Sequence, residues 1–219
     1  MLIMVTRIDL VRHGEVYNPD KVLYGRLEGF RLSERGQEQA QLAAKYLAHP
    51  RRDIVAIYAS PLQRAQETAK PIAEAYGLPI LNDERLLEAG SEFEGTTIGA
   101  NPKQLLNPKA WPLLRNPFTP SWGEPFAEQA DRMIAVVEEA RREYAGHEVV
   151  IVSHQSPIWA ARRALEGKRI WGDPRRRQCT LCSVTTLTYA DGAGIPEISY
   201  AEPAAALSKT LSSEGWSVK

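Results

Sequence analysis

Apolar residues along this chain fall into short runs, and longer amphipathic segments lie between them. The runs at 3–11, Ile54–Ala59 and Glu148–Ser153 are rich in Ile, Leu and Val, as expected for strands that are buried on both faces. Two later runs, at 183–189 and 195–200, surround a turn and predict a further pair of strands. The pattern therefore predicts a sheet with a buried centre.

The segments between the predicted strands carry apolar residues at helical spacing. Ser33 is a typical N-cap for the first helix, which the pattern extends to residue 48. Pro61 can open the second helix because a missing N–H costs nothing in the first turn, and Gly77 ends that helix after residue 76. Two more helices are predicted over 125–144 and 157–166.

The repeated order of strand and helix predicts an α/β fold. Such chains form a mostly parallel sheet with helices on both faces, so we expect a three-layer α/β/α sandwich, with one strand of the sheet antiparallel. Residues 96–124 break the rhythm, since they hold five prolines and two tryptophans with little periodicity. We expect a single domain over 1–203, with 96–124 as an insertion over the active site and 204–219 as a tail.

Composition limits the kinds of partner. The 219 residues include 27 Lys and Arg and 27 Asp and Glu, so no net charge recruits nucleic acid or an acidic membrane. No apolar run approaches the roughly 18 residues of a membrane span, and the N-terminal apolar stretch is typical of a strand rather than a signal peptide. We expect a cytoplasmic protein that binds neither nucleic acid nor membrane, with the choice between monomer and homodimer left open.

The two cysteines, Cys179 and Cys182, form a C-x-x-C pair. Such a pair can be redox-active, but here it precedes a strand and has no second pair for zinc, which favours a structural role. The histidines also lack acidic or thiol partners at ligand spacing. We therefore expect no metal and no cofactor.

Three predicted strands end in residues with unusual chemistry. The first leads into Arg12 and His13, the second is followed by Arg64, and the third ends at His154. In doubly wound sheets, ligands bind beyond the carboxyl ends of the strands. Each residue alone has an ordinary structural explanation, as a solvated charge or a capping group. Their coincidence at one edge of one sheet indicates a site.

This set of residues suits a phosphoryl group. Two guanidiniums offer planar donors to phosphate oxygens, and a neutral imidazole is a competent nucleophile because its usual pKa is about 6.5. Gly14 permits close approach of the backbone, and a helix N-terminus near Ser60 adds affinity for an anion. The sequence thus predicts phosphoryl transfer through His13.

The motifs resemble those of the histidine phosphatase superfamily, which includes the cofactor-dependent phosphoglycerate mutases. V-R-H-G-E at 11–15 carries the resemblance, together with matching segments at 32–40, 59–69, 86–88, 93–95, 123–124 and 150–154. The resemblance covers about residues 5–190 and implies a phosphoglycerate mutase-like fold. It also implies a phosphomonoesterase of the histidine acid phosphatase type.

The resemblance also implies roles for individual residues. His13 would be the phosphorylated nucleophile and Glu88 the proton donor. The phosphate contacts would come from Arg12, Asn18, Arg64, His154 and Gln155. The chain departs from the family pattern at three points: Asn18 follows His13 by one residue fewer than in many members, 88–95 is one residue short, and Gln155 stands where Gly is common.

Glu88 has rivals for the role of acid. A leaving alkoxide needs a proton, so a neutral carboxylic acid must lie near the phosphate. Glu15 is adjacent to the nucleophile but is expected to orient its loop, and Glu92 and Glu94 are expected to pack or pair locally.

The sequence leaves open what happens to the phosphoryl group once His13 holds it. A mutase must hold its intermediate away from water, and the family's mutases carry basic residues in a longer insertion. Here Lys103, Lys109 and Arg115 do not match that segment, which favours hydrolysis of a small phosphorylated metabolite over mutase activity or a non-catalytic binding module.

The basic residues of 168–177 are either a solvated loop or a contact for a second anionic group on the substrate. Four aromatic residues are candidates either for walls of the pocket or for contacts that only hold the insertion in place: Trp111, Phe118, Trp122 and Phe126.

Overall fold

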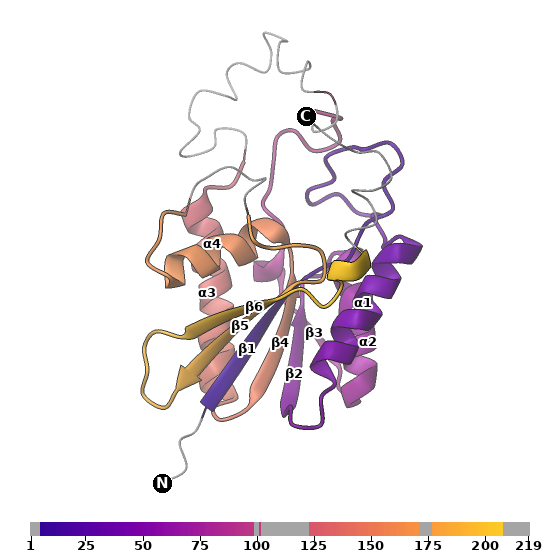
Figure 1. The fold of residues 1–219 in the computed structure, drawn as a ribbon. Coiled ribbons are helices and arrows are strands. Elements are labelled where there is room, and N and C mark those ends of the chain that lie inside the picture. Colours follow the sequence, from indigo (N-terminus) through magenta and orange to yellow (C-terminus); the bar gives the residue numbers. More distant parts are fainter. Residues whose placement is uncertain (1–4, 99–100, 102–122, 171–176, 208–219) are drawn as a thin grey trace.

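The computed structural model describes residues 5–98, 101, 123–170 and 177–207. Their strands form one six-stranded sheet in the order β3-β2-β4-β1-β5-β6 (Figure 1). β5 runs antiparallel to both of its neighbours, and the other strands are parallel to one another. The prediction of a mostly parallel sheet with one antiparallel strand is therefore confirmed. The strands are β1 (Val5–Arg12), β2 (Ile54–Ala59), β3 (Ile80–Asn82), β4 (Glu148–Ser153), β5 (Val184–Ala190) and β6 (Glu197–Ala201).

Helices cover both faces of the sheet and complete the predicted three layers. Figure 1 shows α1 (Glu34–Leu47) and α2 (Gln63–Tyr76) on one face, and α3 (Phe126–Glu143) and α4 (Gln155–Leu165) on the other. The central strands supply apolar side chains to both layers because successive residues of a strand point to opposite faces. In β1, Leu10 belongs to the core under α3 and α4, whereas Val11 belongs to the core under α1 and α2.

Several helix ends follow from local sequence. The Ser33 hydroxyl accepts a hydrogen bond from the Gly36 N–H at 3.0 Å, which is the predicted N-cap. Gly77 ends α2 in the left-handed conformation, with φ +63°. α4 begins at Gln155, two residues before the predicted start at Pro157. The proline fits within the first turn because the N–H that it lacks would have no partner within the helix.

Two short elements were not predicted. β3 has only three residues at the edge of the sheet and is largely exposed, so its apolar pattern is weak. The 3-10 helix η1 (Glu84–Leu86) follows it and buries Leu86. α2 also begins two residues after the predicted Pro61, since Leu62 is the N-cap.

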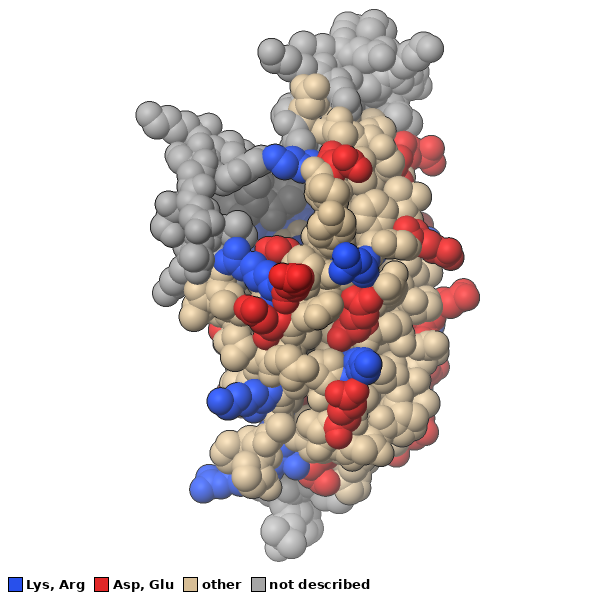
Figure 2. Space-filling view, turned by 90° about the vertical axis from the view of Figure 1, so that its right-hand side faces the viewer, with Lys and Arg blue, Asp and Glu red and all other residues tan. Residues whose placement is uncertain are grey.

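Some predictions lie outside the described residues. These include the strand start at residue 3, most of the 96–124 insertion and the tail beyond 207. On the side of the molecule that Figure 2 shows, basic and acidic side chains are interspersed without a broad region of one sign. None of the helices in the described ranges combines the length and the apolar character that crossing a membrane requires.

Candidate active site

The carboxyl ends of β1, β2 and β4 lie side by side because these strands are parallel neighbours. The His13 N–H donates to the Ser153 carbonyl at 3.0 Å, and the Ser60 N–H donates to the Val152 carbonyl at 3.0 Å. The imidazole rings of His13 and His154 are 5.1 Å apart between centroids. The fold thus brings the strand-end residues together at one edge of the sheet.

His13 is held in one tautomer. Its Nδ1 lies 2.7 Å from the carbonyl oxygen of Gly14, which can only accept, so Nδ1 carries the proton. Burial, followed by the nearby charges of Arg12 and Arg64, lowers the pKa of His13 well below 6.5. The ring is therefore neutral at pH 7, and the lone pair on Nε2 is available as a nucleophile.

Two glycines fix the loop that carries the nucleophile. A Cβ on Gly14 would lie 2.6 Å from the Gly36 carbonyl oxygen, and a Cβ on Gly36 would lie 2.0 Å from the Glu15 carbonyl oxygen. The Gly14 N–H also donates to the Thr68 hydroxyl at 3.1 Å. The R-H-G motif and the start of α1 can pack this closely only because both positions lack a side chain.

The two arginines bring positive charge into the protein interior. The Arg12 Nη1 donates to the Cys179 carbonyl at 2.7 Å, and the Arg64 Nη2 donates to the Gly25 carbonyl at 2.6 Å. Within the described part of the chain, neither forms an ion pair, and the buried Nε of each has no hydrogen-bond partner. Since a guanidinium has five N–H donors, both retain donors for an anion.

His154 offers a further donor. Its Nε2 lies 2.8 Å from the Ser60 hydroxyl oxygen, which also accepts from the Leu62 N–H. The Ser60 hydroxyl can either donate to Nε2 or accept from it, and the tautomer with the proton on Nδ1 is the one that offers a donor to a ligand. Burial is the largest cause that lowers the pKa of His154, and its buried Nδ1 has no partner among the described residues. A phosphoryl oxygen is a suitable acceptor for that proton.

Two helices begin at this edge of the sheet. Neither α2 nor α4 has a side-chain cap on its first N–H groups, and His154 itself is the N-cap residue of α4. Free N–H groups and the helix dipole favour an anion at such positions. Gln155 is the first residue of α4, and its side-chain amide lies 3.4 Å from the Cys179 carbonyl that Arg12 also contacts.

A cavity of about 420 Å³ opens over His13. This volume lies in the range of about 300–1,000 Å³ that is usual for small-molecule sites. Figure 2 shows a hollow in the upper part of the molecule, with basic and acidic side chains beside it. The described residues that line the cavity include Arg12, His13, Tyr24, Glu88, Gln155 and Arg177.

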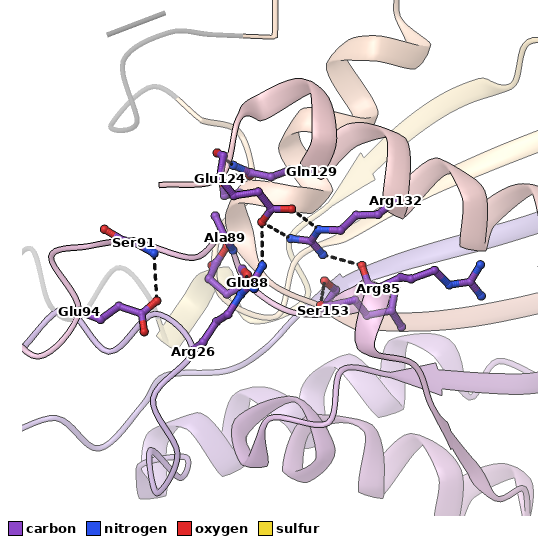
Figure 3. Close-up of polar contacts among 12 residues, drawn as sticks. Arg26, Arg85, Glu88, Ala89, Ser91, Glu94, Glu124, Gln129, Arg132 and Ser153 are labelled. Atoms are coloured by element: carbon purple, nitrogen blue, oxygen red, sulfur yellow. Dashed lines mark hydrogen bonds and ion pairs between the residues drawn. The ribbon is translucent and has the colours of Figure 1, made fainter. Parts of the chain in front are cut away.

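Glu88 is placed at this cavity by a network of neighbouring segments (Figure 3). Arg26 links the Glu88 backbone to Glu124, because its Nε donates to the Glu88 carbonyl at 2.7 Å and its Nη2 to the Glu124 carboxylate at 2.8 Å. Arg132 binds both oxygens of Glu124, at 2.6 and 3.0 Å, and donates to the Arg85 carbonyl at 2.5 Å. The loop that carries Glu88 is therefore fixed from both sides.

The rival acids have other partners. Glu15 accepts from the Ser33 hydroxyl at 2.8 Å, Glu94 accepts from the Ser91 N–H at 3.2 Å, and Glu92 is exposed. Glu88 accepts only from the adjacent Ala89 N–H, at 2.8 Å, among the bonds described for its carboxylate. Of the two carboxylates on the described lining of the cavity, Glu124 is bound by two arginines, so Glu88 is the better suited to exchange a proton with a ligand.

Asn18 has a local role in the structure. Its side-chain amide donates to the Val22 carbonyl at 2.9 Å and accepts from the Val22 N–H at 3.1 Å. Both ends of the amide therefore close the turn over residues 18–22. The described lining of the cavity does not include Asn18, and its phosphate contact stays a prediction.

Tyr24 lies at the site although the sequence pattern assigns it no role. The Arg64 guanidinium carbon lies 4.8 Å from the centre of the Tyr24 ring, and that ring stacks on Phe30 at 5.2 Å. Burial raises the pKa of Tyr24, which keeps the phenol protonated at neutral pH. No local pattern around residue 24 marks it as part of the site. Arg26 was missed for the same reason, and Glu124 was recognised only as part of a motif.

The cysteine pair has the features of structural thiols. Cys179 and Cys182 are both buried and free, and burial raises the pKa of each, to about 12 for Cys182. Reactive cysteines are exposed and have a lowered pKa instead. The backbone of the pair serves the site directly, since the Cys179 carbonyl accepts from Arg12.

Other candidate residues fall partly outside the described ranges. Of the basic run, Lys168 forms an ion pair with Glu166 at 2.9 Å, whereas Arg177 lines the cavity. Phe126 also lines it. The candidate residues that lie outside the described ranges are Lys103, Lys109, Trp111, Arg115, Phe118, Trp122, Arg175 and Arg176.

Comparison with known proteins agrees with this geometry. A model of the histidine phosphatase superfamily (branch 1) matches residues 8–198. The uncharacterized protein Rv0525 of Mycobacterium tuberculosis is 54% identical over 200 residues, which cover 91% of this chain and 98% of that protein. Phosphoserine phosphatase 1 of Hydrogenobacter thermophilus is 33% identical over 172 residues, 74% of this chain and 77% of that protein. The structure of a mycobacterial glucosyl-3-phosphoglycerate phosphatase, Rv2419c, is similar with a TM-score of 0.72 at 28% identity, covering 90% of this chain and 97% of that one.

Proposed function

Because this chain belongs to the histidine phosphatase superfamily, we propose that it hydrolyses a phosphate monoester of a small metabolite through a phosphohistidine intermediate on His13. The observation that carries the proposal is the state of His13: a buried, neutral ring whose protonated Nδ1 is bound to Gly14. Its Nε2 lone pair is the atom that attacks. The N–H donors of Arg12, Arg64 and His154 lie at the same edge of the sheet as this atom.

In the first step, Nε2 of His13 attacks the phosphorus atom, and the bond from phosphorus to the ester oxygen breaks. The two guanidiniums and the Nδ1–H of His154 stabilise the charge on the equatorial oxygens of the phosphoryl group. Glu88, in its protonated form, gives its proton to the departing alkoxide. The products of this step are the free alcohol and phosphohistidine.

In the second step, the Glu88 carboxylate takes a proton from a water molecule. The water oxygen attacks phosphorus, the bond from phosphorus to Nε2 breaks, and inorganic phosphate leaves. Glu88 then holds the proton that the next turnover needs. The same residue thus acts as acid and base, as microscopic reversibility requires for a site with one such group.

Related proteins support the choice of substrate class. One relative is named a phosphoserine phosphatase, and a structural neighbour is named a glucosyl-3-phosphoglycerate phosphatase. Both names describe hydrolysis of a small phosphate monoester. Two buried free cysteines also suit a reducing compartment, which supports the cytoplasm as the site of action.

The test is turnover of p-nitrophenyl phosphate by the parent protein and by His13→Ala. We expect the parent to release p-nitrophenol and the variant to lose at least a thousandfold in turnover. Rapid quenching at alkaline pH followed by mass spectrometry should find an acid-labile phosphate on His13. Absence of turnover with any phosphoester would overturn the proposal, and conversion of 3-phosphoglycerate to 2-phosphoglycerate without phosphate release would favour a mutase instead.

A further inference from the structure

Resting on the proposed phosphatase function, we propose that Ser60 is a positioning residue that selects the tautomer of His154. In the selected form the ring carries its proton on Nδ1, where it can donate to the phosphoryl group, and Nε2 accepts from the Ser60 hydroxyl. The distance between Nε2 and the hydroxyl oxygen is 2.8 Å. Ser60 thus acts on the reaction through His154, without touching the substrate.

The sheet places Ser60 beside the His154 ring. β2 and β4 are parallel neighbours with Ala59 opposite Val152, so the residues that follow them emerge at the same edge. The Ser60 N–H donates to the Val152 carbonyl at 3.0 Å, and the Ser60 carbonyl accepts from the Gln66 side chain at 2.7 Å. Both polar groups of the Ser60 backbone are engaged, which holds the residue in one position.

The hydrogen bonds around the Ser60 hydroxyl disfavour a proton on Nε2. Ser60 and His154 are both 0% exposed, so bulk water does not supply a missing partner. The hydroxyl oxygen already accepts from the Leu62 N–H at 3.4 Å. If Nε2 carried the ring proton, it would donate to the same oxygen. The hydroxyl proton and the Nδ1 lone pair would then both lack a partner among the described residues.

A proton on Nδ1 satisfies more of these groups. The hydroxyl then donates to Nε2 and accepts from the Leu62 N–H, and the Nδ1–H alone lacks a partner in the described part of the chain. Each buried polar group without a partner costs stability, so this tautomer is favoured. Burial lowers the pKa of His154 well below 6.5, and the ring is therefore neutral at pH 7.

Loss of the hydroxyl removes the selection. In Ser60→Ala, neither ring nitrogen of His154 has a hydrogen-bond partner among the described residues. We expect the form with the proton on Nε2 to become populated. That form presents the Nδ1 lone pair to the negatively charged phosphoryl oxygens, so it opposes their binding instead of stabilising their charge.

The experiment measures the 15N chemical shifts of the histidine rings at pH 8, above the usual pKa of histidine. The chain has only four histidines, so substituting each in turn assigns the signals. Two of them are internal standards. Nδ1 of His13 faces a backbone carbonyl and carries the proton, whereas Nδ1 of His49 accepts from a backbone N–H at 3.2 Å, which leaves the proton on Nε2.

In the parent protein we expect His154 to show the shift pattern of His13. In Ser60→Ala, both ring nitrogens of His154 should shift toward the pattern of His49. Ser153→Ala is the matched control, because Ser153 is also a buried serine but its hydroxyl donates to the Leu86 carbonyl at 2.7 Å. This variant should keep the parent's His154 signals, and thermal melting checks that each variant folds.

Kinetics connect the tautomer with the reaction. We expect Ser60→Ala to lower kcat for p-nitrophenyl phosphate at least tenfold and to weaken inhibition by inorganic vanadate at least tenfold. Because Ser60 acts through His154, adding Ser60→Ala to His154→Ala should change kcat by less than twofold. A residue that only stabilises the fold would not show this dependence on His154.

The results distinguish failure of this inference from failure of the phosphatase proposal. A proton on Nε2 of His154 in the parent, or identical His154 signals in the parent and in Ser60→Ala, would show that Ser60 does not select the tautomer. A further tenfold loss of kcat in the double variant would show that Ser60 acts by another route. If the parent hydrolyses no phosphoester, the phosphatase proposal is wrong, and the 15N shifts still decide the tautomer because they need no turnover.

Discussion

Acidification should destabilise this fold through its two buried histidines, and His13 should account for about half of that effect. Burial and the two arginines lower the pKa of His13 in the folded protein, whereas the unfolded chain titrates near 6.5. Below pH 6.5 the unfolded chain therefore binds more protons than the folded one. Stability is full above pH 6.5 and falls as the pH drops below it.

The size of the effect follows from linkage. A histidine that stays neutral in the folded protein removes about 1.4 kcal/mol of stability for each pH unit below 6.5. His154 has its pKa lowered in the same direction, so the parent should lose roughly 2–3 kcal/mol between pH 7.5 and 5.5 from both rings together. His13→Asn removes one titrating ring and should reduce that loss by about 1.4 kcal/mol.

Urea denaturation at pH 7.5 and 5.5, followed by circular dichroism, measures the loss for each protein. Other groups, such as the buried Asp9, are common to parent and variant, and they cancel in the difference. His49→Asn, which replaces an exposed ring, is the control and should lose as much stability as the parent. Equal losses in the parent and His13→Asn would refute the inference that His13 is held neutral.

Four further predictions concern the loops and the chemistry of the site. Glu88→Gln should lower turnover of p-nitrophenyl phosphate at least a hundredfold and leave vanadate inhibition within about threefold, whereas Glu92→Gln should keep parent turnover; equal turnover in both variants would remove Glu88 from the mechanism. Glu124→Gln should reduce kcat and destabilise the fold by about 2 kcal/mol in urea, between the values for exposed and buried ion pairs, because Arg26 and Arg132 lose their shared partner. Gly36→Ala should cost at least about 2 kcal/mol in the same assay, since its Cβ would meet the Glu15 carbonyl, while Gly194→Ala, which meets nothing within 4 Å, should cost little. Activity measured before and after treatment with EDTA should be equal, and a loss that zinc or magnesium restores would contradict the metal-free mechanism.

The sequence predicts the phosphate-binding part of the site because its signals are local. Arg12 is the last residue of β1, His13 directly follows it, and His154 directly follows β4, so the sheet alone determines where they meet. The glycine after His13 has an equally local cause, since Gly14 and Gly36 pack backbone against backbone. Residues placed by regular elements can be predicted once those elements are recognised.

The position of Glu88 depends on residues far apart in the sequence. Its loop is irregular and is fixed by Arg26, 62 residues earlier, and through Glu124 by Arg132. No periodicity connects these segments, so the resemblance could suggest Glu88 but the pattern could not place it. Asn18 illustrates the opposite case: the resemblance implies a phosphate contact, whereas the structure uses its amide to close a turn with Val22.

The cavity combines residues placed by strand ends with residues placed by a loop and a helix start, and the two groups can serve different functions. The end of β1 holds Arg12 and His13 in fixed positions. In the proposed mechanism these two residues contact the phosphoryl group, which every phosphate monoester has. Arg177 and Phe126 approach from a loop and from the start of α3, where substitutions alter the cavity without disturbing the sheet. Selection of the alcohol portion can therefore change while the chemistry on His13 stays fixed.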